Sequence, residues 1–231
     1  MLTFMLLVLQ PIAVHGVDNS ALVAGFRGCG KLGARDVRAQ DVRAQDLPHS
    51  AWSLAKHREH QPVAAKALFA EALVVIRSFG AKDLCKLAWA ASTLQIQDEA
   101  LVAAVAGEIP SRLAEASART LSMTAWSMAK MGAVGPNLWQ PMVRCSMARI
   151  CEFKLQELVV LVWAFAKSKA YQADIFDFAA QEVALRHGSV KTQDASNLAW
   201  AFATLSVDAP GLLPTLSGFA RSRLDGFASK T

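Results

Sequence analysis

Five tryptophans recur along the chain at a constant interval, and this spacing is the strongest constraint on its fold. They are Trp52, Trp89, Trp126, Trp163 and Trp200, each 37 residues from the next. Self-similarity at a period of this size is the signature of a repeat architecture. Cutting the sequence in phase gives the five units 42–78, 79–115, 116–152, 153–189 and 190–226. The period therefore favours one quasi-linear array.

Each unit has the pattern of two helices joined by a turn. The segment around the tryptophan is rich in Ala, Leu and Met, which are good helix formers. Six positions before each tryptophan stand Asp46, Asp83, Thr120, Glu157 and Asp194, and four of these five are good N-cap residues for the first helices, because a short side-chain oxygen can accept from the free N–H groups of the first turn. Apolar residues then recur at helical spacing. They predict second helices over 62–78, 99–115, 137–152, 173–187 and 211–225.

These elements predict an all-α fold, an α-solenoid of five 37-residue helix-turn-helix repeats over 42–226. One hairpin cannot bury both of its faces, but stacked neighbours can. We expect the tryptophan column to be inter-repeat core, with small residues one and three positions later allowing close approach of the helices. Residues 1–41 form a separate N-terminal segment, and 227–231 a tail. The apolar start is compatible with a targeting sequence, a buried helix or a wrongly chosen start.

Composition narrows the class of protein further. The chain is 53% apolar, which excludes a disordered protein. Its net charge of +5 permits a polyanionic partner without requiring one. The four cysteines form no CxxC pair and are typical of reduced thiols in an intracellular or organellar protein. No apolar stretch is long enough to span a membrane, so we expect no membrane partner.

The motif around each tryptophan resembles a known repeat family. The segment QDASNLAWAFAT at 193–204 is similar to the core of octotricopeptide-type repeats, and related helical repeats occur in FAST-kinase-like proteins and in a subunit of the RNA-editing substrate-binding complex. The resemblance covers 42–226. It implies an RNA-binding protein of the mitochondrion or chloroplast that acts in RNA processing, stability, editing or translation. The chain departs from the pattern at Ala195, at Thr120 and at Pro48–His49.

A polar stripe on the first helices is the candidate RNA-binding surface. The positions seven before, three before, one after and four after each tryptophan fall within one arc of about 80°. Its candidate RNA-binding residues are Gln45, His49, Lys56, Lys82, Lys86, Arg119, Lys130, Gln156, Lys167, Gln193 and Asn197. Helical-repeat readers bind about one base per unit, so five units would cover about five nucleotides. The alternative is an ordinary solvated helix face.

A second column lies 23 residues after the tryptophans. Arg112, Arg149, Arg186 and Arg223 would form a basic ladder, and the planar guanidinium suits phosphate recognition. The alternative is structural, because arginine in a last helical turn interacts favourably with the helix dipole.

Other motifs give no support to catalysis. Gly28–Gly33 matches GxGxxG, but no strand precedes it, and Leu32 stands where a P-loop needs Ser or Thr. The pair His57 and His60 lacks companion ligands at metal-binding spacing. We therefore expect no enzyme, cofactor or metal site. The rival class is a protein-interaction scaffold, because Met123 and Val160 place apolar side chains on the stripe.

Overall fold

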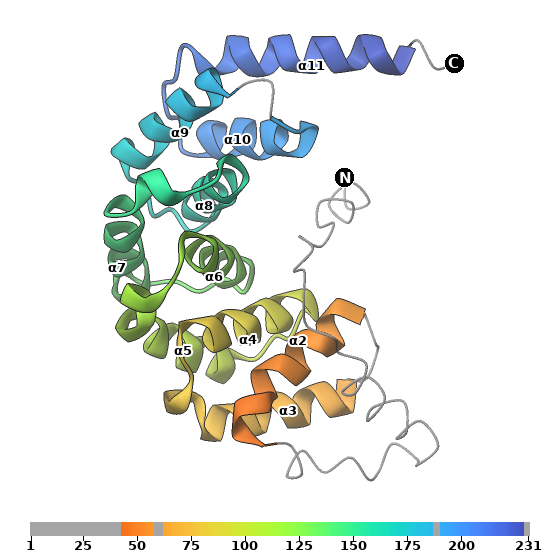
Figure 1. Cartoon of the computed structure of the whole chain (residues 1–231), viewed down its shortest axis with the longest axis vertical. Coiled ribbons are helices and arrows are strands. Elements are labelled where there is room, and N and C mark those ends of the chain that lie inside the picture. The colour runs from red at the N-terminus through yellow and green to blue at the C-terminus, as the bar shows by residue number, and fades with distance from the viewer. Residues whose placement is uncertain (1–42, 58–61, 187–189, 229–231) are drawn as a thin grey trace.

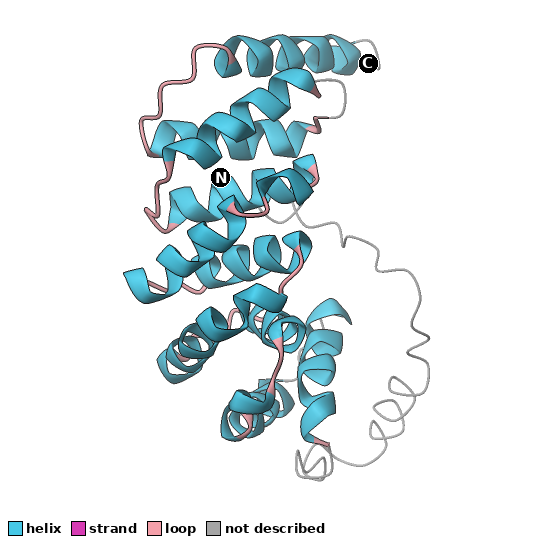
Figure 2. Ribbon diagram, turned by 60° about the vertical axis from the view of Figure 1, so that its left-hand side comes forward, coloured by secondary structure: helices cyan, strands magenta, loops and turns pink. Residues whose placement is uncertain are grey.

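The computed structural model describes residues 43–57, 62–186 and 190–228. Within these ranges, ten α-helices and four short 3-10 helices follow one another, and no residue forms a strand. The predicted all-α class is confirmed. Figure 2 shows the helices joined by short loops.

The helices form two layers of a curved stack (Figure 1). The inner layer consists of α2 (Leu47–His57), α4 (Ala81–Thr93), α6 (Ala118–Lys130), α8 (Leu155–Lys167) and α10 (Thr192–Thr204). The outer helices are α3 (Pro62–Val74), α5 (Glu99–Glu108), α7 (Pro136–Met147) and α9 (Ala173–Leu185), and α11 (Leu212–Ala228) ends the stack. The 3-10 helices are η4 (Ala44–Asp46), η5 (Ile76–Ser78), η6 (Ile109–Glu115) and η7 (Ile150–Glu152). Each inner helix contacts the next inner helix and the outer helix that follows it in the chain.

Four of the inner helices, from α4 to α10, begin three residues earlier than the sequence predicted. The N-cap of α6 is Ser117, whose Oγ accepts a hydrogen bond from the Thr120 N–H at 3.2 Å. In α8 the Glu157 carboxylate accepts from the backbone N–H of the N-cap residue Lys154 at 3.1 Å. The N-cap assignment of the residues six before each tryptophan is therefore wrong for α4, α6, α8 and α10. Those residues lie in the first turn, where a carboxylate can reach back to the cap and favours the helix dipole.

The same backbone motif ends the inner helices from α4 to α10. The residue six after the tryptophan is left-handed each time, with φ of 56° at Gln95, 75° at Gly132, 56° at Lys169 and 53° at Ser206. The next N–H bonds to the carbonyl five residues back, as from Ala170 to Phe165 at 2.9 Å. This is the Schellman motif, which favours glycine at the left-handed position. Three of the four positions carry a Cβ and are strained.

The core lies between the two layers and between successive inner helices. Leu84, Leu121 and Leu158, each five residues before a tryptophan, are at most 1% exposed. The residues one after the tryptophan are fully buried in the later inner helices (Ala90, Ser127, Ala164 and Ala201), so small side chains at this position do allow close packing.

The repeated tryptophans, however, lie at the edge of this core. Trp200 is 41% exposed and the other four are half-buried, so the prediction that they form the inter-repeat core is wrong. Leucine and alanine already fill the space between the layers, and the indoles lie beside it. Trp139 differs from the repeated five, because it is buried and its Nε1 donates to the Ala133 carbonyl at 3.0 Å.

Candidate nucleic-acid interface

Four positions of each unit lie on one face along the inner helices, with Gln45 in η4 just before α2, and we call this face the inner stripe. These are the tryptophan itself and the residues seven before, three before and four after it. Its members are Gln45, His49, Trp52 and Lys56; Lys82, Lys86, Trp89 and Thr93; Arg119, Met123, Trp126 and Lys130; Gln156, Val160, Trp163 and Lys167; and Gln193, Asn197, Trp200 and Thr204. None of them is fully buried.

The predicted stripe is thus corrected by a small rotation of each helix. The position one after the tryptophan drops out, because Ala90, Ser127, Ala164 and Ala201 are buried against neighbouring helices. The tryptophan takes its place. Sequence reasoning missed the indoles because it assigned them to the core. On a helical wheel with the tryptophan at zero degrees, the predicted stripe begins at about 20°, so the indoles lie next to it.

Indole rings recur along the inner stripe, and some of them contact each other or a cation. Trp52 and Trp89 contact each other with ring centroids 6.2 Å apart, and Trp163 and Trp200 with centroids 5.7 Å apart. The Lys56 Nζ lies 4.8 Å from the centroid of Trp52, within the range of a cation–π interaction. The first two units and the last two units therefore each share an aromatic contact, and a cation lies against the first of these rings.

A lysine ammonium group also lies against the ring of the central tryptophan, Trp126. The Lys130 Nζ lies 5.0 Å from the ring centroid of Trp126. Partial burial against the helix surface lowers the pKa of Lys130, because desolvation disfavours its charged form. An ammonium that has already lost part of its hydration loses less on contact with a phosphate or a base.

At the first unit a neutral imidazole extends the aromatic surface. The His49 ring stacks on Trp52 with centroids 5.6 Å apart and planes inclined by 28°. Burial lowers the pKa of His49, and the positive charge of Lys86 lowers it further. The ring is therefore mainly uncharged at neutral pH, where it can stack and hydrogen-bond.

The charge of the inner stripe is positive and unevenly distributed. Its cations are Lys56, Lys82, Lys86, Arg119, Lys130 and Lys167, and no carboxylate belongs to it. Asp83 beside the stripe pairs with Lys86 at 3.1 Å and offsets part of that charge. Five of the six cations lie on α2, α4 and α6, so one end of the stripe is cationic.

The other end of the stripe is uncharged. On α10 the Gln193 Nε2 donates to the Asn197 Oδ1 at 2.9 Å, and the Thr204 hydroxyl donates to the Trp200 carbonyl at 2.7 Å. Asp194, next to Gln193, is buried, and its carboxylate accepts a hydrogen bond from the backbone N–H of Lys191 at 3.1 Å. Burial raises the pKa of this carboxyl group. Amide and hydroxyl groups thus surround the most exposed of the five indoles.

The arginine ladder does not join the inner stripe. The Arg112 Nε donates to the Phe79 carbonyl at 3.2 Å, and another guanidinium nitrogen donates to the Arg77 carbonyl at 3.1 Å. Arg149 donates to the Ala116 carbonyl, which is equivalent to that of Phe79 one unit later. These two arginines hold the chain where one unit passes into the next inner helix. Their role is therefore structural, but their carbonyl partners belong to the connection from the preceding unit, which the sequence did not predict.

The remaining two ladder positions give no further contact to the stripe. Arg186 forms an ion pair with Glu182 at 2.6 Å, one turn earlier on α9. Arg223 belongs to α11, and its side chain lies outside the described residues. The proposed surface therefore excludes the ladder.

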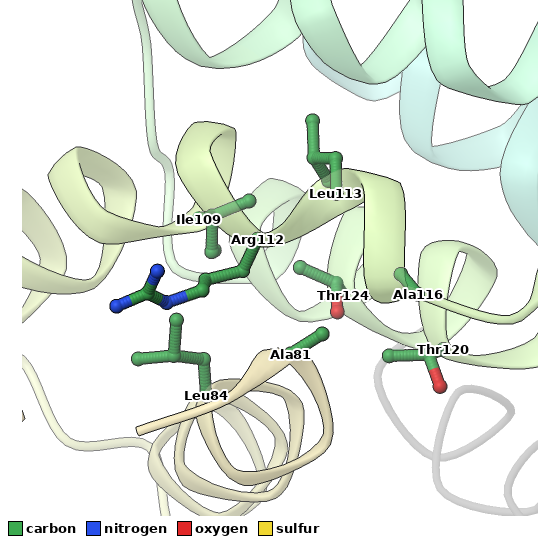
Figure 3. Close-up of a pocket in the computed structure, with 8 residues that line it drawn as sticks. All are labelled: Ala81, Leu84, Ile109, Arg112, Leu113, Ala116, Thr120 and Thr124. Atoms are coloured by element: carbon green, nitrogen blue, oxygen red, sulfur yellow. The ribbon is translucent and has the colours of Figure 1, made fainter. Parts of the chain in front are cut away.

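The structure offers little room for a small ligand at the Arg112 site. Figure 3 shows the cavity there. Its volume is about 10 Å³, and its lining is Ala81, Leu84, Ile109, Arg112, Leu113, Ala116, Thr120 and Thr124. This is space for about one water molecule, so the cavity is part of the packing.

Within the described ranges, no group of three His, Cys, Asp or Glu side chains could hold a metal ion. No helix in that part of the chain has the length and hydropathy to cross a membrane. The segment 1–41, with the Gly28–Gly33 motif, and His60 lie outside the described residues. Comparisons with protein-family models and with curated proteins find no match to the chain.

Proposed function

We propose that residues 42–226 form an α-solenoid of five 37-residue helix-turn-helix repeats that binds single-stranded RNA along the inner stripe. One observation carries the proposal: a partly exposed indole recurs on the same face of all five inner helices, and four of these helices carry cations on that face. Proteins that bind single strands combine a cationic track for the phosphates with aromatic rings on which bases stack. The inner stripe has both components.

The same arrangement favours single strands over duplexes. Bases can stack on an indole only when they are unpaired and splayed from their own strand. In a duplex the base faces are covered by neighbouring pairs, so the indole column would have nothing to contact. We therefore expect the protein to bind single-stranded RNA more tightly than double-stranded RNA.

The biological setting follows from the resemblance of the tryptophan motif to octotricopeptide-type repeats. We propose a non-catalytic role in RNA processing, stability, editing or translation within a mitochondrion or chloroplast. In such a role the protein would mark or protect a segment of RNA and leave the chemistry to protein partners.

Fluorescence anisotropy with labelled single-stranded RNA tests the proposal. Affinity should fall with salt, with a log–log slope of about −0.7 for each phosphate neutralised. Replacing the four lysines Lys82, Lys86, Lys130 and Lys167 together by glutamate should abolish binding. Double-stranded RNA of the same length should bind the wild-type protein weakly. A folded sample that binds no single strand at low salt contradicts the proposal.

A protein partner is the second candidate, and one feature favours it. Met123 and Val160 are half-buried on the stripe of α6 and α8, beside Trp126 and Trp163. This apolar centre could hold the apolar face of a partner helix. Binding driven by such contacts would depend weakly on salt, which separates it from RNA binding.

A further inference from the structure

The inner face of α10 differs chemically from that of every other inner helix. Its stripe residues are Gln193, Asn197, Trp200 and Thr204, and none is charged. Each of the other four inner helices carries at least one lysine on the stripe. The stripe of α10 therefore offers no cation to a phosphate, although the exposed Lys191 lies at the N-cap of this helix, and the stripe itself suits a neutral group.

The geometry of α10 places a stacking ring beside a hydrogen-bonding edge. Trp200 is 41% exposed, and Trp163 supports it, with ring planes inclined by 35°. Asn197 lies three residues before Trp200, on the same face of the helix. The hydrogen bond from Gln193 Nε2 to Asn197 Oδ1 at 2.9 Å holds the Asn197 amide in one orientation.

At the N7 edge of an unpaired purine, an amide held in this way matches adenine better than guanine. Asparagine and glutamine side chains present a donor and an acceptor side by side, which pair with N7 and the N6 amino group of adenine. Guanine presents two acceptors at the same edge and is better matched by arginine or lysine. Base edges are open to such contacts in single-stranded RNA.

We propose that α10 is the base-reading end of the inner stripe, where an unpaired adenine stacks on Trp200 and hydrogen-bonds the Asn197 amide. The cations of α2, α4 and α6 hold phosphates without regard to sequence. This inference rests on the proposed function. It adds that α2, α4 and α6 supply most of the affinity for RNA, whereas α10 supplies the base preference.

The experiment compares strands that differ in one base. The probes are octauridylate and the same strand with adenosine, guanosine or cytidine at its fourth position, each measured by anisotropy at several salt concentrations. The wild-type protein should bind the adenosine strand on the order of tenfold more tightly than octauridylate, the scale of one stacked and hydrogen-bonded base.

Substitutions assign that preference to α10. Asn197→Ala should remove most of the preference for adenosine, and Trp200→Ala should weaken binding of the adenosine strand to the level of octauridylate. Trp200→Phe keeps an aromatic ring and should keep most of the preference. The matched control is Gln181→Ala, which truncates an exposed amide on the outer helix α9, away from the inner stripe, and should leave the preference for adenosine intact. None of these changes should alter the salt slope, since none removes a cation.

The outcomes separate this inference from the proposed function. Failure of the folded wild type to bind any strand at low salt contradicts the proposed function itself. Salt-dependent binding with equal affinity for all four strands leaves that function standing and overturns the base-reading role of α10. A preference for guanosine or cytidine, or a preference for adenosine that survives Asn197→Ala and Trp200→Ala, overturns it as well.

Discussion

Replacement of Arg112 by methionine should destabilise the fold and leave RNA binding unchanged. Methionine keeps the apolar stem, which lies beside Leu84 and Ile109 in Figure 3, and removes the guanidinium. The bond to the Phe79 carbonyl is partly buried, whereas the bond to the Arg77 carbonyl is exposed. A hydrogen bond from a charged donor contributes about 1.5–3 kcal/mol when it is shielded from water. Counting the shielded bond in full and the exposed bond for little gives a loss of about 2 kcal/mol.

The assay for this loss is thermal unfolding followed by circular dichroism. For a domain of this size, about 2 kcal/mol corresponds to a fall in Tm of roughly 4–8 °C. Arg144→Met is the matched control, because Arg144 is an exposed arginine of the outer helix α7 and its replacement should change stability by less than about 0.5 kcal/mol. Both variants should bind single-stranded RNA as the wild type does. The reasoning is refuted if Arg112→Met keeps the wild-type Tm and loses RNA affinity, since the ladder would then contact RNA.

Three further predictions concern charge, pH and backbone strain. Replacing Lys82 and Lys86 together by glutamine should weaken binding to all RNA strands alike and reduce the salt slope by about 1.4, measured by anisotropy; an unchanged slope would place the phosphates elsewhere. Burial raises the pKa of the Cys85 thiol from 9.0 to about 11, so the unfolded chain loses this proton at a lower pH than the folded chain does. The free energy of unfolding should therefore fall as the pH rises from 9 to 11. Cys85→Ser should lessen this fall, measured as the midpoint of urea unfolding at each pH. Lys169→Gly should raise stability by about 1 kcal/mol by relieving the left-handed residue, whereas Lys169→Ala should not, and equal effects of the two would contradict the strain.

The sequence was sufficient to predict the helices, because the tryptophan interval and the spacing of apolar residues recur in every unit. The interval between tryptophans placed the first helices, and apolar spacing placed the second ones close to their observed bounds. The starts were wrong by three residues because Glu157 and Asp194 act from the first turn of the helix and not from its cap. A carboxylate at either position looks the same in sequence.

The candidate surface was harder to predict than the helices. Tryptophan is large and apolar, so assigning it to the core was the natural choice, yet Leu121 and its equivalents already fill the space between the layers. Whether Arg112 faces solvent or a carbonyl depends on the path of a neighbouring unit, which no local pattern specifies. The polar residues around Asn197 were identified from helical spacing alone, because spacing determines which residues share a face.

Intrinsic tryptophan fluorescence tests the central claim, that single-stranded RNA lies along the indole column. Five of the six tryptophans belong to the inner stripe, and Trp139 is buried in the core, away from it. Octauridylate added at low salt should quench most of the emission, added salt should restore it, and a duplex of equal length should quench far less. Emission that stays unchanged while the single strand binds would show that the RNA lies elsewhere on the molecule and would contradict the account.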